Sequence, residues 1–278
     1  MMQGTLYIVA TPIGNLEDMT CRSLRVLKDA DLIAAEDTRH TKRLLNHFGI
    51  STPLVSYYRE KEAQRSHTLI AKMQKGAKIA LVSDAGTPAI SDPGAVLVRQ
   101  ARKQGITIVP IPGPSALSAA LSCAGLEPGS FLFLGFPPAK PGQRKKLLKS
   151  LVSLPYPLVF YESPHRIGPF IDDAGSILGN RVVFWAREMT KAYEEIIETT
   201  VTDLARSIKS EKTRGELVVI IHPDRQTEPD SEDIDEILSW YRDKTDLSLR
   251  DACRKIARDL GVSRTEIYRR GLDLWKEK

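Results

Sequence analysis

The stretch that decides the fold of this chain is Ser83-Asp84-Ala85-Gly86-Thr87-Pro88-Ala89-Ile90-Ser91-Asp92-Pro93-Gly94. The segment before it, 78–82, ends in apolar residues as a buried strand does, and the segment after it, 95–104, has helical spacing. A Gly- and Pro-rich loop between a strand and a helix is typical of ligand sites in open α/β sheets, because backbone can approach the ligand closely. Loops this long usually have a function, although a rigid turn without a ligand is the alternative.

Strand-like and helix-like segments alternate through the first part of the chain. Predicted strands cover 6–10, 32–35, 53–56, 79–83 and 107–111, and predicted helices cover 20–28, 38–48, 62–75 and 95–104. This rhythm predicts a mostly parallel sheet with helices on both faces.

The next part of the chain predicts a second, mixed α/β domain. Its strands are expected at 131–136, 158–162, 182–187, 196–201 and 217–222, and its helices at 145–151, 167–178 and 203–210. Two of these strands follow one another with little between them, which favours a sheet that is not purely parallel. The predicted fold class is therefore α/β, with two α/β domains, 1–116 and 117–225, that face one another.

The last part, 226–278, predicts a linker and a small helical unit. Residues 226–233 are polar, acidic and contain a proline, which is typical of a linker. Ser248 and Ser263 each begin a capping box, and Gly261 supplies a turn between the two helices that follow them. Two capped helices joined at a glycine predict a helix-turn-helix. This unit either contacts nucleic acid or packs on the rest of the protein and stabilises it.

Composition narrows the class of protein. The chain has 278 residues, of which 42% are hydrophobic and 27% charged, with a net charge of +5 and a pI near 9.0. These values fit a globular protein, and the positive charge suits a partner that carries phosphates. Its three cysteines, Cys21, Cys123 and Cys253, form no disulfide or metal-binding pattern, so we expect a cytoplasmic protein. We expect neither a signal peptide nor a membrane span.

Charged clusters follow several of the predicted strands. They are Glu36-Asp37-Thr38-Arg39-His40, Tyr161-Glu162-Ser163-Pro164-His165-Arg166, Arg187-Glu188-Met189-Thr190-Lys191 and Arg214-Gly215-Glu216. Helix capping explains Asp37 but not the cations beside it. Several such clusters on neighbouring strands predict a polar wall that faces the loops of the first domain, although any one of them could be a structural ion pair.

A basic run and a glycine loop give weaker signals. Lys140, Arg144, Lys145, Lys146 and Lys149 predict either a solvated helix face or a mobile phosphate-binding loop. The segment 11–16, Thr-Pro-Ile-Gly-Asn-Leu, follows the first strand without the G-x-G-x-x-G spacing of a dinucleotide site.

The motifs TPIGNLEDMT, EDTRHT, SDAGTPAISDPG, PGPSA, YESPHR, REMTK and RGE occur in this order across residues 4–222. In this series the chain resembles the tetrapyrrole-methylase-like superfamily of S-adenosylmethionine methyltransferases. Within that superfamily it is most similar to the family that methylates the 2′-oxygen of a cytidine in 16S ribosomal RNA. Tetrapyrrole methylases themselves carry P-x-G-x-G after the first strand, where this chain has Pro12-Ile13-Gly14-Asn15, and this departure argues against a porphyrin-like substrate.

The resemblance implies that S-adenosylmethionine lies in the cleft between the two α/β domains. It also implies a homodimer that acts on 16S ribosomal RNA or on the small ribosomal subunit. The residues expected to hold the cofactor are Pro12, Gly14, Asn15, Leu16, Asp84, Ala85, Gly86, Thr87, Ile90, Ser91, Ser115, Ala116, Tyr161, Glu162 and Arg187.

The chemistry indicates a second set of residues. A ribose hydroxyl is a weak acid, so a base must accept its proton during attack on the methyl group. The candidate bases are Glu36, Asp37, Glu162, His165 and Glu188, and the sequence does not choose among them. Cations can bind the neighbouring phosphates or stabilise the forming alkoxide. The expected catalytic set is Glu36, Arg39, His165, Arg166 and Lys191, and no metal is expected.

Two other functions remain open at this point. One is a methyltransferase of the same fold that acts on a small molecule such as a tetrapyrrole. The other is a non-enzymatic regulator that binds nucleic acid through its tail, although residues 242–278 hold only eleven Lys and Arg against seven Asp and Glu.

Overall fold

The computed structural model describes residues 4–126, 129–210, 215–224, 231–245, 247–260 and 262–275. It divides into two compact units, 1–223 and 224–278. Three features predicted above lie outside the described residues: the motif residue Arg214, the linker 226–230 and the turn at Gly261.

The first sheet is wholly parallel. Its strands are β1 (Thr5–Val9), β2 (Leu32–Ala35), β3 (Leu54–Ser56), β4 (Lys78–Val82) and β5 (Thr107–Ile111), in the order β3-β2-β4-β1-β5. Its helices are α1 (Cys21–Asp29), α2 (Thr38–His47), α3 (Glu62–Gln74) and α4 (Ala95–Lys103), with short 3₁₀ turns η1 (Leu16–Asp18) and η2 (Arg59–Lys61). Each strand and helix lies within one residue of its predicted ends, so the predicted α/β fold is confirmed.

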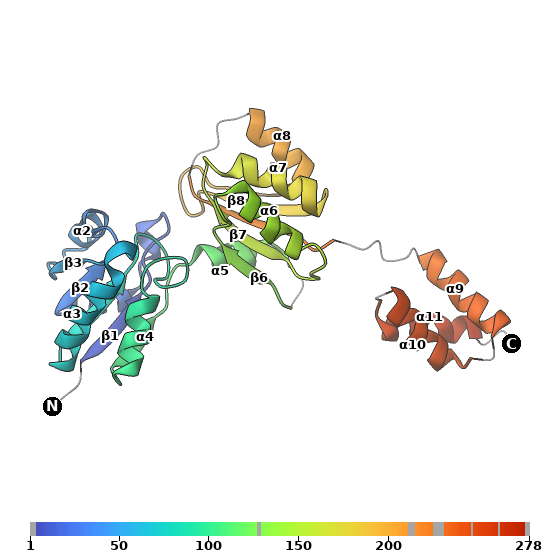
Figure 1. Cartoon of the computed structure of the whole chain (residues 1–278), viewed down its shortest axis with the longest axis horizontal. Helices are drawn as coiled ribbons and strands as arrows, with labels where there is room; N and C mark the ends of the chain where they lie inside the picture. Colours follow the sequence, from blue (N-terminus) through green and yellow to red (C-terminus); the bar gives the residue numbers. More distant parts are fainter. Residues whose placement is uncertain are drawn as a thin grey trace. The chain divides into compact units, whose positions relative to one another are not determined.

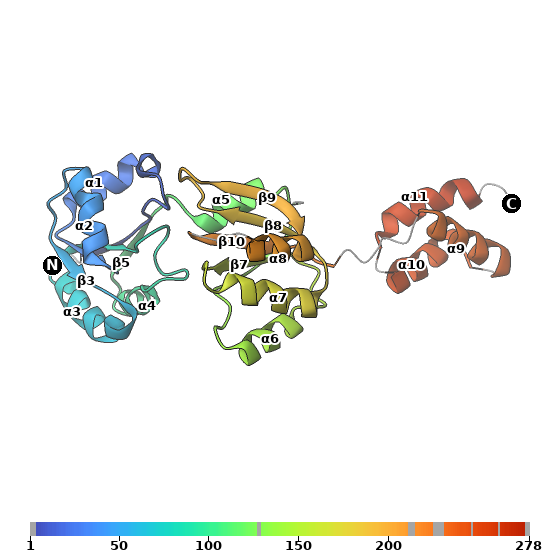
Figure 2. The same cartoon turned by 90° about the horizontal axis from the view of Figure 1, so that it is seen from above.

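Helices cover both faces of this sheet because its strands are apolar on both sides. On one face, Leu27 of α1 and Leu45 of α2 pack on strand residues such as Ile33. On the other, Met73 of α3 and Leu97 of α4 pack on a second set of strand side chains. Figure 2 shows α1 and α2 on one side of the sheet and α3 and α4 on the other.

The strand order puts β1 next to β4 at the centre of the sheet. From β1 the chain crosses to β2 on one side, and from β4 it crosses to β5 on the other side. The strand order thus reverses between β1 and β4, and ligands of open α/β sheets bind at the carboxyl ends of such strands. The loops there are 10–15 and 83–94.

The second sheet is mixed. Its strands are β6 (Leu132–Gly135), β7 (Leu158–Glu162), β8 (Val182–Arg187), β9 (Glu195–Thr200) and β10 (Leu217–Ile221), in the order β6-β7-β10-β8-β9. Only β6 and β7 are parallel among these pairs. Its helices are α5 (Ala116–Cys123), α6 (Pro141–Ser150), α7 (Ile167–Leu178) and α8 (Val201–Ser210). As Figure 1 shows, α6, α7 and α8 lie apart from α5, on the opposite face of this sheet.

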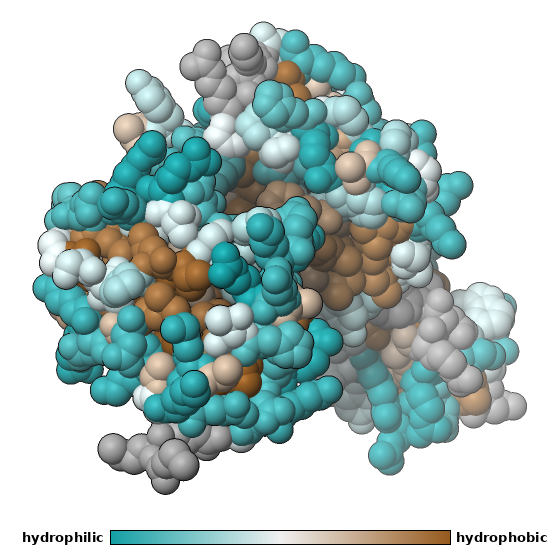
Figure 3. Space-filling view, turned by 60° about the vertical axis from the view of Figure 1, so that its left-hand side comes forward, coloured by the Kyte–Doolittle hydropathy of each residue, from teal (hydrophilic) through white to brown (hydrophobic). Residues whose placement is uncertain are grey.

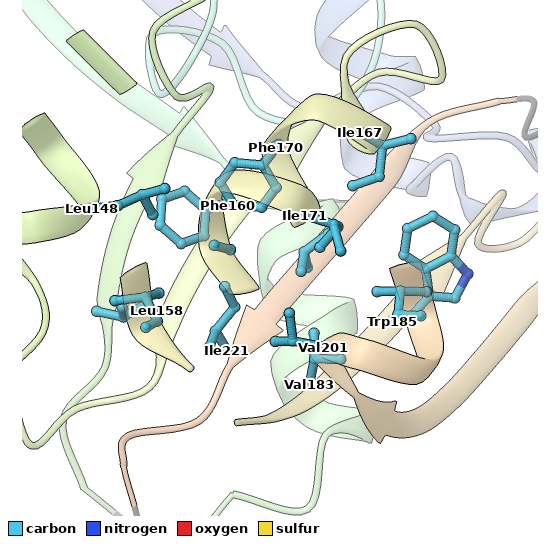
Figure 4. Packing of buried hydrophobic residues seen from close by; sticks show 14 of the residues in the cluster. Leu148, Leu158, Phe160, Ile167, Phe170, Ile171, Val183, Trp185, Val201 and Ile221 are labelled. Carbon is cyan, nitrogen blue, oxygen red and sulfur yellow. The ribbon is translucent and has the colours of Figure 1, made fainter. Parts of the chain in front are cut away.

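Alternation along the strands builds two separate cores. Leu158 and Phe160 of β7 point toward α6–α8, where Phe160 packs on Phe170 with ring centroids 4.9 Å apart (Figure 4). Val159 points to the other face and packs in a cluster with Ala120 of α5. Helix α5 therefore packs on the second sheet.

The unit 224–278 contains three helices, α9 (Ser231–Lys244), α10 (Leu249–Leu260) and α11 (Arg264–Leu274). Apolar residues from all three form its core, and Leu238, Cys253 and Ile267 are fully buried in it. The linker prediction is wrong for 231–233, which begin α9, because the burial of Ile234 and Leu238 outweighs their polar neighbours. Ser248 caps α10 as predicted, whereas Ser263 makes no side-chain cap bond.

The described part of the chain lacks two features. No helix in it is both long enough and apolar enough to cross a membrane. It contains no group of three or more His, Cys, Asp or Glu side chains arranged to hold a metal ion.

Candidate functional site

A pocket of about 360 Å³ lies at the carboxyl ends of the first sheet and is closed by residues of the second. In the space-filling view, an apolar recess is edged by hydrophilic side chains (Figure 3). The predicted site residues that line the pocket are Glu36, Asp84, Ala85, Gly86, Thr87, Ile90, Ser91, Ser115, Ala116, Tyr161 and Glu162. The strand-end loops thus converge on one pocket, as their positions in the sequence indicate.

Backbone bonds between two loops fix the first wall of the pocket. Thr11 and Gly86 exchange two bonds of 2.9 Å, in which each N–H donates to the other residue's carbonyl. The Thr11 hydroxyl also donates to the carbonyl of Ser83, at 3.1 Å. Gly86 has a φ of +72°, a conformation in which a side chain is strained. The pairing with Thr11 holds residue 86 at this positive φ, and this explains why a glycine follows Ala85 in the loop.

Three carboxylates gather in this wall: Glu36, Asp84 and Asp92. Burial raises the pKa of Glu36 to about 7, and the nearby Asp92 and Asp84 charges add to the rise. Burial also raises the pKa of Asp92. Asp84 accepts a hydrogen bond of 3.0 Å from the backbone N–H of Asp37, so its carboxylate is held in place. The pocket is therefore acidic, and one of its carboxyl groups exchanges its proton near neutral pH.

Aromatic and buried polar residues form the wall contributed by β7. The Tyr161 hydroxyl accepts a bond of 3.0 Å from the N–H of Leu117, and its ring packs edge-on against Phe133 and Phe136. The Glu162 side chain is fully buried, and burial raises its pKa although Arg166 lies 3.4 Å away.

A strained turn completes the pocket at the end of β8. Met189 lines the pocket between Glu188 and Thr190, which have φ values of +51° and +68°. Lys191 donates to Glu188 at 2.8 Å and to Glu216 at 3.1 Å. Burial lowers the pKa of Lys191, but these carboxylates outweigh it and raise the pKa above its usual value. Non-glycine residues with positive φ cluster at functional sites.

The remaining predicted cofactor residues lie outside the lining. The loop with Pro12, Gly14, Asn15 and Leu16 reaches the pocket only through Ile13. A side chain at Gly14 would collide with Lys191, so this glycine makes room for that lysine. Arg187 forms an ion pair of 2.8 Å with Glu195 on β9. Their contacts with a cofactor stay predictions.

The predicted catalytic cations have different surroundings. The side chain of Arg39 is 88% exposed on the first turn of α2, so it is accessible to a large substrate. His165 is exposed next to Pro164, a pocket residue. Arg166 donates to the carbonyl of Pro137 and to Glu162, and its Nε is buried. Arg166 is therefore engaged by Pro137 and Glu162.

Sequence reasoning missed part of the lining: Ile13, Asp92, Phe136, Ser163, Pro164, Met189, Gly215, Glu216, Leu217 and Val218. Most of these are neighbours of predicted residues within quoted motifs, and that adjacency was the available signal. Phe136 and Val218 lie in apolar runs and have no such signal.

The basic run between 140 and 149 is not a mobile loop. Lys140 is the N-cap of helix α6 and the other four cations lie within it, where the Arg144 side chain is 6% exposed and pairs with Asp173 at 2.6 Å. Lys145 pairs with the same carboxylate at 3.4 Å. Arg144 and Lys145 thus join α6 to α7 through ion pairs with Asp173. The prediction of a mobile phosphate-binding loop is wrong, because this run forms a helix.

Comparisons with known proteins agree in one family. A family model described as tetrapyrrole (corrin/porphyrin) methylases matches residues 5–205. A "Ribosomal RNA small subunit methyltransferase I" from Halalkalibacterium halodurans is 44% identical, over 96% of this chain and 94% of that protein. A protein of the same name from Escherichia coli O157:H7 is 45% identical, over 98% of this chain and 96% of that one.

Solved structures show the same fold at lower identity. The cobalt precorrin-4 methyltransferase structure is 18% identical with a TM-score of 0.58, and the match covers 78% of this chain and 94% of that one. The uroporphyrin III C-methyl transferase from Thermus thermophilus is also 18% identical, with a TM-score of 0.57 and coverage of 78% and 97%. At this identity the likeness concerns the fold alone.

Proposed function

Because this chain belongs to the tetrapyrrole (corrin/porphyrin) methylase family, and within it to the ribosomal RNA small subunit methyltransferase I group, we propose that it methylates ribosomal RNA. The methyl donor is S-adenosylmethionine, and the acceptor is the ribose 2′-hydroxyl of a cytidine in 16S ribosomal RNA. The names of the relatives support the class of acceptor. The 2′-oxygen and the cytidine come from the motif resemblance.

The pocket residues fit this donor. The apolar side chains of Ile13, Ile90 and Met189 suit the adenosine, and the carboxylates of Asp84 and Asp92 suit the positive sulfonium and ammonium groups. The volume of about 360 Å³ lies within the usual range for cofactor sites. When bound, S-adenosylmethionine supplies an electrophilic methyl group on sulfur. The loop 83–94, Ser115, Ala116 and the β7 wall would hold it.

Glu36 is the residue we assign as the general base. Burial raises its pKa to about 7, close to the working pH, so its carboxylate can accept the proton of an attacking hydroxyl. Asp37 instead caps α2 by accepting the N–H of Arg39, and Glu188 pairs with Lys191, so both are already engaged. Glu36 lines the pocket and is within reach of a substrate that enters it.

Arg39 is the cation best placed for RNA. It lies three residues after Glu36 on an exposed helix turn, where it can contact a phosphate next to the reacting ribose. Arg166 and Lys191 instead hold the pocket walls together through Glu162, Glu188 and Glu216.

We also infer a homodimer, as the resemblance implies. The edge strand β9 and the preceding turn expose Tyr193, Ile196 and Ile197, whose apolar side chains fit a subunit contact. Sedimentation velocity over a range of protein concentrations tests this point, and a monomer at all concentrations would contradict it.

The position of Glu36 in the pocket carries the proposal, and one experiment tests it. The protein is incubated with methyl-labelled S-adenosylmethionine and unmethylated small subunits, free 16S RNA or uroporphyrinogen. We expect label in RNA, at a nucleotide that resists alkaline cleavage, because 2′-O-methylation removes the attacking hydroxyl. Label on a base, in protein or only in the tetrapyrrole would overturn it, and binding of RNA without transfer would favour a non-enzymatic regulator.

A further inference from the structure

The pocket loop 83–94 is anchored at its two ends by different means. Its first half is held by the backbone pairing of Gly86 with Thr11. Its second half, which brings Ile90, Ser91 and Asp92 to the pocket, makes no comparable backbone pairing among the described residues. Two side chains from η2 and α3 bond to it instead.

Glu62 is the first of these side chains. Its Oε1 accepts the backbone N–H of Gly94 at 2.6 Å and that of Val96 at 3.5 Å. These are N–H groups at the start of α4, which have no partner within the helix. The first turn of α4 has no acidic residue and no side-chain cap of its own. Glu62 therefore caps a helix that lies 32 residues further along the chain.

Helix α4 cannot cap itself. Its N-cap residue is Gly94, with a φ of +143°. A Cβ atom at this position would lie 2.8 Å from Leu81 and 2.9 Å from Ala89, so Ser, Asp or Asn does not fit there. The close approach that packs the loop on β4 thus excludes a local cap, and the acceptor has to come from another element.

The second side chain and a buried tyrosine complete the anchor. The guanidinium of Arg59 donates to the carbonyl of Ser91 at 3.3 Å. Tyr57, which is 1% exposed, donates to Glu62 at 3.2 Å and lies 3.0 Å from the hydroxyl of Ser66. Tyr57 belongs to the core between the first sheet and α3, so it fixes the Glu62 carboxylate against a rigid part of the fold.

We propose that Glu62, assisted by Arg59, is a positioning residue of the pocket: it holds the second half of the loop in place without lining the pocket itself. The inference deepens the proposed function, since it assumes that this loop binds S-adenosylmethionine. Glu62 acts through the loop backbone, so its loss should weaken donor binding much more than it slows methyl transfer at saturating donor.

The test compares Glu62→Ala with Glu62→Gln and with Glu60→Ala, an exposed neighbour on η2. Hydrogen exchange of the protein without donor comes first. We expect the peptides covering 87–98 to exchange at least tenfold faster in Glu62→Ala, to recover in part in Glu62→Gln, which keeps an acceptor oxygen, and to be unchanged in Glu60→Ala. Peptides from β7 and β8 should not change in any variant.

Donor affinity is then measured by calorimetry. We expect the Kd for S-adenosylmethionine to rise about tenfold in Glu62→Ala, with kcat within about a factor of three. Unchanged exchange and affinity in a folded Glu62→Ala protein would overturn the inference, as would faster exchange without a change in affinity. If the wild type does not bind S-adenosylmethionine, the proposed function fails, and the assignment of Glu62 as a donor-positioning residue fails with it. The exchange data alone then report whether Glu62 caps α4.

Discussion

A single carboxyl group, Glu36, combines a cost in stability with a proposed catalytic role. Its pKa is about 7 in the folded protein against 4.5 ordinarily, chiefly because of burial. The folded state therefore binds this proton more tightly than the unfolded state does, and stability falls between pH 4.5 and 7 as the carboxyl group ionises. Such a cost is expected of a base that has to work near neutral pH.

Glu36→Gln tests both the proposed catalytic role of Glu36 and its cost in stability. We expect methyl transfer to fall more than a hundredfold, since the amide cannot accept the proton. We expect the melting temperature at pH 8 to rise by about 2–4 °C, for a gain on the order of 1 kcal/mol after allowance for partial exposure. The wild-type rate should rise with pH through about 7. Retained activity with the same pH profile in the variant would exclude Glu36 as the base.

The two arginines of the predicted catalytic set should behave differently. Arg39→Ala removes an exposed cation, so we expect methylation of RNA to fall more than tenfold with donor affinity within a factor of three. Arg166→Ala breaks contacts with Glu162 and Pro137, so we expect a loss of thermal stability as well as of activity. Arg102→Ala, an exposed residue in the last turn of α4, is the control. Normal RNA kinetics in Arg39→Ala would show that this arginine does not contact the substrate.

At the residue scale, the sequence predicts which residues converge at the carboxyl ends of neighbouring strands. It does not predict contacts that depend on how distant segments pack. Asp84, Gly86 and Glu36 follow predicted parallel strands, so their convergence could be foreseen. The assignment of Arg166 to RNA could not be checked in advance, because its partner Pro137 lies 29 residues away on another strand's loop. The role of Glu62 depends in the same way on a distant backbone N–H.

At the scale of elements, the loop 83–94 gives the most direct test of donor binding. Leucine at Gly86 adds atoms next to Ile13, whose Cγ2 lies 3.5 Å from a Cβ built at this position. We expect Gly86→Leu to lower donor affinity more than tenfold in calorimetry. The control is Gly49→Leu, because Gly49 has a similar φ of +62° but no atom within 4 Å of a built Cβ. Both variants bear the same backbone strain of about 1–2 kcal/mol, and only Gly86→Leu should lose the donor.

The elements themselves were predictable because each signal is local. Apolar periodicity places α2 and α7, and short apolar runs place β2 and β7, within one residue of the ends found in the structure. Strand order is different, since β10 lies between β7 and β8 through pairings of residues far apart in the chain. Helix α9 was missed because its first turn is as polar as a linker.

At the scale of the whole molecule, the unit 224–278 is the part whose role the catalytic pocket does not explain. Over residues 231–278, Lys and Arg number eleven and Asp and Glu number eleven, so this segment carries no net formal charge. Nine of these eleven cations lie in α10, in α11 and in the last turn of α9, and the first half of α9 is acidic. Exposed Arg264, Thr265 and Tyr268 at the start of α11 are the surface that we expect to meet RNA.

Removing residues 231–278 tests this role. We expect the RNA concentration for half-maximal methylation to rise about threefold to tenfold. The slope of log affinity against log salt concentration should become less steep, by the amount that about one or two lost phosphate contacts would cause. Donor affinity should persist, since the pocket belongs wholly to the unit 1–223. Unchanged RNA affinity at every salt concentration would show that these helices do not contribute to RNA binding.

The pocket wall is also part of the hydrophobic core. Ile13 and Met189 line the pocket, and both belong to the cluster that joins α5 to the second sheet. A donor at a hundred times its Kd would then stabilise the fold by about 2.7 kcal/mol, so the lifetime of the protein in a cell should follow the supply of methyl donor. A pulse–chase measurement during methionine starvation should show faster proteolysis, and an unchanged half-life would refute this link. The amount of this enzyme in a cell would then fall when methionine, and with it the methyl donor, is scarce.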